Sequence, residues 1–111
     1  MEKNMSILET KEESDIKGLI YSIKGKEVML DSDIAELFNI ETKNLNKAMK
    51  RNLNRFPNDF CFQLNFKELQ SQRFQNATFR ESTKNRKYRP YVYTEQGIIT
   101  LAGVLKTNPN G

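Results

Sequence analysis

Residues Asp31–Lys50, with the sequence DSDIAELFNIETKNLNKAMK, contain two helical patterns that meet at the tripeptide NIE. The first pattern predicts a short helix over DSDIAELF, whose apolar face is formed by Ile34, Leu37 and Phe38. Asp31 or Ser32 is expected to cap the first amide groups of this helix, because short polar side chains accept hydrogen bonds there. The stretch thus predicts a helical pair joined by a very short turn.

The second helix is expected to run from about Thr42, as its N-cap, towards Arg55, because Pro57 forces the residue before it out of helical geometry. Its apolar residues fall in one stripe, formed by Leu45, Ala48, Met49, Leu53 and Phe56. The opposite side carries Lys43, Lys47, Lys50, Arg51 and Asn54. One face therefore packs on a core and the other is positively charged.

This pair fits a helix-turn-helix motif at the positions that matter most for packing. Ala35 supplies a small residue where the helices touch, and Leu45 is an apolar anchor for the second helix. Asn39 occupies the turn position usually held by glycine, and asparagine also tolerates left-handed backbone geometry. The motif leaves two interpretations open, a DNA-reading helix-turn-helix and a helical hairpin with a solvated basic face.

The basic residues gather in two separate segments of a 111-residue chain whose net charge is only +4. Residues 42–58 contain five bases and no acid, and residues 73–89 contain six bases and a single acid, Glu81. The second segment, which has no clear period, is expected to be a disordered loop or an arm laid along a nucleic-acid backbone. This asymmetry suggests a basic surface for a polyanionic partner.

Composition narrows the class of protein. The length is typical of one domain, with a polar tail over residues 1–15, the domain over 16–106 and a second tail over 107–111. Because the chain has one cysteine, Cys61, and no signal peptide or apolar span, a reducing and cytoplasmic location without membrane attachment is expected. Without histidine, neither a Ser/His/Asp set nor a Cys/His metal site can form, so we expect a non-enzyme without cofactor or metal.

Further patterns predict a small sheet and additional helices. Leu19–Ile23 and Glu27–Leu30 flank Lys-Gly-Lys and are typical of a β-hairpin. The residues that alternate along DFCFQLNF, and are expected to face the core, are Phe60, Phe62, Leu64 and Phe66. Asn65 and Glu68 predict a capping box for a brief helix, Tyr91–Tyr93 a strand, and Thr94 the N-cap of a mostly buried helix. Gly97 in its first turn suggests a close approach of backbone.

Two strings carry a resemblance to a known family. RFPNDFCFQL after AMKRN, and YRPYVYTEQGI before an apolar helix, resemble the ORF6N domain, a relative of the KilA-N domain, over roughly residues 16–106. The resemblance implies a DNA-binding module of phage or prophage proteins in bacteria, often the N-terminal part of antirepressor-like regulators. A bacterial or phage-encoded origin is expected on the same ground.

Together these observations predict an α+β fold, in which a small sheet packs with the helical pair and a C-terminal helix. The domain is expected to bind duplex DNA in transcription regulation or antirepression. The residues expected to contact DNA are Thr42, Lys43, Asn44, Asn46, Lys47, Lys50, Arg51, Arg55, Arg86, Lys87 and Arg89. The candidates for contacts with nucleobase edges are Lys43, Asn44, Asn46 and Lys47. The remaining lysines and arginines are expected to contact phosphates. The alternative is a protein-interaction domain, with antirepressor function, whose basic face binds an acidic protein; a homo-oligomer is compatible with both.

Overall fold

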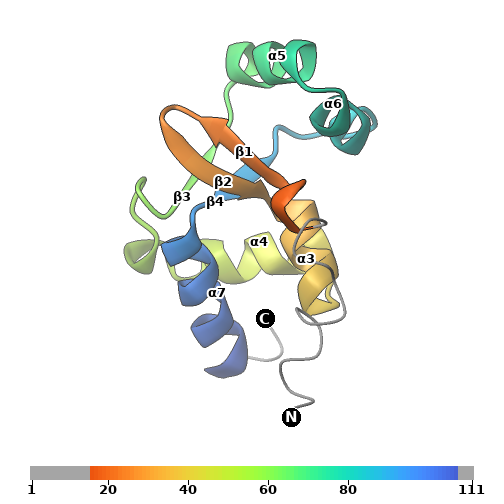
Figure 1. Ribbon diagram of the computed structural model, residues 1–111. Helices are drawn as coiled ribbons and strands as arrows, with labels where there is room; N and C mark the ends of the chain where they lie inside the picture. The colour runs from red at the N-terminus through yellow and green to blue at the C-terminus, as the bar shows by residue number, and fades with distance from the viewer. Residues whose placement is uncertain (1–15, 108–111) are drawn as a thin grey trace.

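The computed structural model describes residues 16–107 and shows an α+β fold with helices on both faces of a four-stranded antiparallel sheet (Figure 1). The sheet has the order β1-β2-β4-β3, with strands β1 (Ile20–Ile23), β2 (Lys26–Leu30), β3 (Cys61–Gln63) and β4 (Tyr91–Tyr93). The expected tail at 1–15 lies outside the described residues, as do residues 108–111 of the expected tail at 107–111, whereas Thr107 is the last residue of a helix. No helix in the range 16–107 is long and apolar enough to cross a membrane.

The sheet separates two apolar clusters because side chains alternate between its faces. On one face, Met29, Cys61 and Tyr93 pack against helices α3 (Asp31–Phe38), α4 (Thr42–Lys50) and α7 (Glu95–Thr107). On the other, Val28 and Val92 pack against α5 (Phe66–Gln75) and α6 (Ala77–Thr83). Figure 1 shows these two helical layers on opposite sides of the strands.

The expected β-hairpin is confirmed. β1 and β2 pair antiparallel, with Ile23 opposite Lys26, so only Lys24 and Gly25 form the turn. Both turn residues have positive φ, 58° at Lys24 and 76° at Gly25. This is the geometry of a tight two-residue turn whose twist matches the strands, and glycine adopts it without a steric cost.

The helical pair is confirmed as a helix–turn–helix, with one detail wrong. Asn39 ends α3 in left-handed geometry, with φ 60° and ψ 45°, as its position in the motif predicts. The prediction that Asp31 or Ser32 is the N-cap is wrong, because Leu30 occupies that place and no side chain caps the helix. Asp31 is already helical, and its carboxylate is fully buried.

Helix α4 is shorter than the sequence pattern predicts, since it ends at Lys50 instead of Arg55. The side-chain amide of Asn52 donates to the carbonyl of Ala48 at 2.9 Å, and a short 3₁₀ helix, η2 (Leu53–Arg55), follows. This break lets Phe56 turn into the core beside Pro57 and leaves Leu53 62% exposed. The predicted apolar stripe is therefore wrong at Leu53. Thr42 is the first helical residue and Glu41 its N-cap, which corrects the expected start as well.

Two helices occupy much of the segment expected to be a loop or an arm. Asn65 and Glu68 form the predicted capping box, but α5 continues to Gln75. Asn76 caps α6 by accepting from the amide of Phe79 at 3.0 Å, so irregular structure begins only after Thr83. Both helices are mostly polar and bury few side chains, which is why no apolar period revealed them.

The alternating aromatic strand is only partly as predicted. Leu64 is buried and Phe62 partly buried in the cluster under α5 and α6, but β3 has three residues and Phe66 is 66% exposed at the start of α5. Cys61 faces the other cluster, and burial raises the pKa of its thiol to about 12. A thiol with so high a pKa stays protonated at neutral pH. Cys61 therefore acts as a small buried packing residue and not as a reactive group.

Candidate nucleic-acid interface

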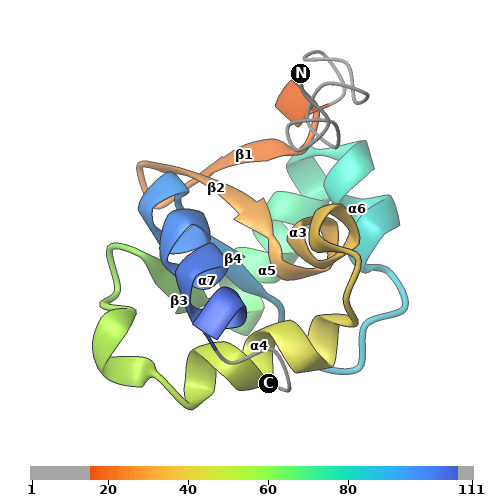
Figure 2. The same ribbon diagram turned by 90° about the horizontal axis from the view of Figure 1, so that it is seen from below.

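A groove lies between α4 and the segment 84–91, which links α6 to β4 and includes the first residue of that strand. Figure 2 shows this link passing beside the N-terminal part of α4. The groove encloses about 580 Å³ and is lined by Thr42, Lys43, Asn46, Lys47, Lys50, Arg51, Gln63, Arg86, Tyr88, Arg89 and Tyr91. We call this the basic groove. It joins the two basic segments, which lie far apart in the sequence, into one surface.

Most of the predicted contact residues meet in this groove. From α4 and the residue after it come Thr42, Lys43, Asn46, Lys47, Lys50 and Arg51, and from the link come Arg86 and Arg89. Three predicted residues are not among its lining. Asn44 is an exposed residue of α4, Arg55 is exposed on η2, and Lys87 is exposed in the link.

The groove is positively charged, because lysines and arginines but no Asp or Glu are among the described residues that line it. The side chains of Lys43, Lys47 and Arg51 are all exposed. Lys50 is placed over the ring of Tyr91, with its Nζ 5.3 Å from the ring centroid. Such a concave surface concentrates positive potential where an anionic chain could lie.

Three residues that line the groove are not among the contacts expected from the sequence, namely Gln63, Tyr88 and Tyr91. The Gln63 amide donates to the carbonyl of Arg89 at 3.0 Å and so holds the link against β3. Tyr88 is 78% exposed at the rim. The string KYRPY interleaves bases with aromatic rings, and that pattern is typical of surfaces on which nucleobases stack, so it could have indicated both tyrosines.

Beneath the groove, the buried carboxylate of Asp31 holds its two walls together. Arg86 of the link donates two hydrogen bonds to it, Nη1 to Oδ1 and Nη2 to Oδ2, both at 3.0 Å. Asn46 of α4 donates to Oδ2 at 2.8 Å, and the backbone amides of Ser32 and Tyr91 donate at 2.7 and 3.2 Å. We call this set the Asp31 clasp. It joins α3, α4 and the link through one side chain that is fully buried.

The clasp changes the roles of two predicted contact residues. The amide of Asn46 also accepts a hydrogen bond from the Tyr93 hydroxyl at 2.9 Å, so both ends of its side chain are engaged inside the protein. Burial raises the pKa of Tyr93 far above its ordinary value, which keeps this hydroxyl protonated and able to donate. The charge of Arg86 is paired with Asp31. Both residues therefore shape the groove, and the exposed charge comes from their neighbours.

Asp33 lies two residues after Asp31 in the first turn of α3, where its surroundings disfavour the charged form of its carboxyl group. Burial, followed by the nearby carboxylates of Glu36 and Asp31, raises its pKa to about 6, and Arg86 opposes this only in part. Its Oδ2 is buried and has no hydrogen-bond partner among the described residues. Burial and the two neighbouring carboxylates outweigh the favourable interaction of a first-turn acid with the helix dipole.

We expect Asp33→Asn to stabilise the protein at pH 7 to 8 by on the order of 1–2 kcal/mol, a value reduced for the partial exposure of the group. The folded state binds the Asp33 proton more tightly than the unfolded state, so its contribution to stability is present below about pH 4 and is lost as pH rises through about 6. Urea unfolding of wild type and variant across this range is the measurement. The advantage of the variant should vanish in acid; an advantage that is equal at every pH would contradict the assignment.

Comparison with known proteins gives one match. No curated protein and no solved structure matches the chain. A family model, described as ORF6N domain, matches residues 18–104. The match spans the hairpin, the helix–turn–helix, the basic groove and most of α7, and agrees with the resemblance of RFPNDFCFQL and YRPYVYTEQGI. The chain therefore belongs to the ORF6N domain family.

Proposed function

We propose that the basic groove binds duplex DNA, and that the chain serves transcription regulation or antirepression in a phage or mobile element without catalysing a reaction. The observation that carries this proposal is the meeting of two basic segments in one groove, whose lining among residues 16–107 includes no Asp or Glu. Phosphate contacts from such a surface release condensed counterions, and this release supplies much of the affinity for DNA.

The groove supports a division of labour between its residues. Lys43 projects from the first turn of α4, the part of a recognition helix that enters the major groove in helix-turn-helix proteins, and Lys47 lies four residues further on. Asn44 is exposed and can offer its amide to a base edge, whereas the Asn46 amide is held by Asp31 and Tyr93. Phosphates of the DNA backbone are then bound by Lys50, Arg51 and Arg89.

We expect Lys47→Ala with Arg51→Ala to weaken duplex binding and to lower the magnitude of the log–log salt slope by up to about 1.8 units, if both residues touch phosphate. Both side chains are exposed, so the melting temperature should change little. Fluorescence anisotropy of labelled duplexes over a salt series measures both quantities. A preferred and a scrambled duplex separate base reading from phosphate binding.

The matched control is Lys17→Ala with Lys67→Ala, which removes the same charge from exposed positions outside the groove. It should leave affinity and salt slope nearly unchanged. Equal losses in the two double variants would show that net charge, and not the groove, attracts DNA. A wild-type protein that binds no duplex at low salt would favour the alternative, in which the same groove binds an acidic protein partner.

A further inference from the structure

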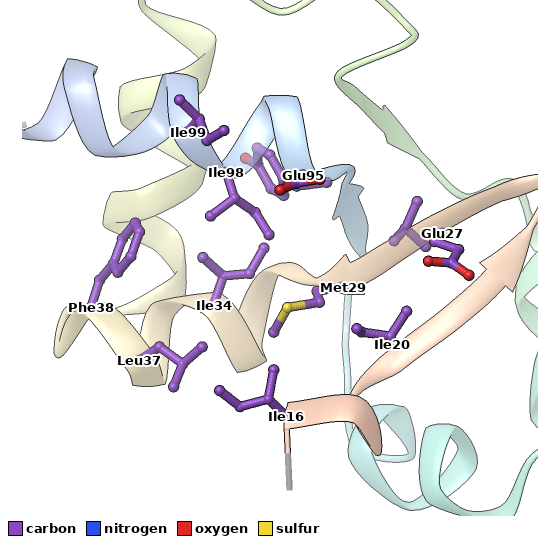
Figure 3. A pocket seen from close by; sticks show the side chains of 12 residues that line it. Ile16, Ile20, Glu27, Met29, Ile34, Leu37, Phe38, Glu95, Ile98 and Ile99 are labelled. Carbon is purple, nitrogen blue, oxygen red and sulfur yellow. The ribbon is translucent and has the colours of Figure 1, made fainter. Parts of the chain in front are cut away.

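A second surface of the molecule is apolar and lies on α7 and beside it. A cavity of about 570 Å³ opens between α7, α3 and the β1–β2 hairpin (Figure 3). In that view Ile98 points towards Ile34 of α3, while Ile99 lies on the opposite side of the helix ribbon. Ile99 is 56% exposed, although it belongs to the central turns of the helix. Singly exposed isoleucines are common on protein surfaces, but Ile99 also lines this cavity, so the exposed apolar surface extends beyond one residue.

The exposed side of α7 has the spacing of a helix-pairing seam. Glu95, Ile99, Ala102 and Lys106 are all exposed and follow intervals of four, three and four residues, which places them in one stripe. The stripe lies opposite Gly97, Leu101 and Val104, which are buried. We call these four residues the α7 stripe. Its centre is apolar and its two ends carry opposite charges.

We propose that the α7 stripe binds the α7 stripe of a second copy of this chain, with the two helices antiparallel. A two-fold axis between Ile99 and Ala102 sets each Ile99 against the partner's Ala102, so that a large side chain meets a small one. The same register sets each Glu95 against the partner's Lys106, which forms two equivalent ion pairs. A parallel pair would set Glu95 against Glu95 and Lys106 against Lys106.

The test exploits the charges at the two ends. Sedimentation velocity over a concentration series should show reversible dimers for the wild type. Glu95→Lys alone and Lys106→Glu alone should each weaken association by about tenfold or more, since like charges then face each other at both ends. An equimolar mixture of the two variants should associate again, because every lysine then faces a glutamate across the seam.

Two further variants separate this seam from other surfaces. Ile99→Ser should weaken association, and Ile20→Ser, at another exposed apolar residue beside the same cavity, should not. Circular dichroism melts at low concentration should show that all variants stay folded. A wild type that is monomeric throughout, an Ile99→Ser variant that still dimerises, or single-charge variants that fail to associate when mixed would each overturn the proposal. Since no step involves DNA, the result does not depend on the proposed function.

Discussion

Replacement of Gly97 by alanine is expected to destabilise the fold by about 3 kcal/mol or more, which is the upper range for overpacking a well-filled site. A Cβ at this position would overlap the carbonyl oxygen of Phe60 and lie 2.9 Å from its carbonyl carbon. The obstacle is backbone and cannot rotate away as a side chain would. The same oxygen accepts from the backbone amide of Thr94 at 3.0 Å, so moving it would break the bond that holds the residue before α7 against Phe60.

The matched control is Gly103→Ala in the same helix. Its new Cβ meets nothing within 4 Å, so only the better helix propensity of alanine remains, worth up to about 1 kcal/mol of stabilisation. Urea unfolding at low protein concentration measures both variants without interference from association. Similar effects at the two positions would show that the approach of α7 to Phe60 is not what requires Gly97.

Gly97 is among the features that sequence alone predicts, and its companions share a physical basis. The hairpin turn at Lys24-Gly25, the left-handed Asn39 and the Asn65–Glu68 capping box each depend on a few consecutive residues. Their backbone geometry follows from local sterics and local hydrogen bonds. The strand Tyr91–Tyr93 and the two amphipathic helices of the motif were predicted for the same reason.

The structural predictions that were wrong concern features that depend on contacts between residues distant in the sequence. The early end of helix α4 allows Phe56 to pack against Tyr93. The two ring centroids are 6.2 Å apart in an edge-to-face arrangement. The C-terminal part of α5 and the whole of α6 were not predicted, because both helices are mostly polar and only Leu69, Phe79 and Thr83 are buried in them. Periodicity alone carries no signal for such elements.

The candidate site shows the same division. Charge and helical spacing identified the exposed cations of α4, because exposed residues need no partner within the fold. The engagement of Asn46 and Arg86 could not be predicted, because their common acceptor, Asp31, lies 15 and 55 residues away in the chain. As a helix-start residue, Asp31 seemed an ordinary N-cap, and nothing local distinguishes a cap from a buried carboxylate.

Breaking the Asp31 clasp is the second change with a large expected effect. Arg86→Met should cost about 3–5 kcal/mol, because it leaves the fully buried Asp31 carboxylate without its ion partner. Asp31→Asn should cost less, about 1–3 kcal/mol, since the Arg86 side chain is 21% exposed and can turn towards water. The double variant should lose less than the sum of the two, and this non-additivity measures the coupling.

Breaking the clasp should also change the affinity for duplex DNA, and two explanations predict changes in opposite directions. Asp31→Asn frees the charge of Arg86 inside the basic groove, so attraction by charge alone would tighten duplex binding. If the clasp fixes the link 84–91 against α4, losing it lets the walls separate, and binding weakens although the groove is more positive. We expect weaker binding, measured by anisotropy well below the melting temperature of the variant. Tighter binding would show that the groove attracts DNA by its charge and not by its shape, and the role of Asp31 would then be confined to stability.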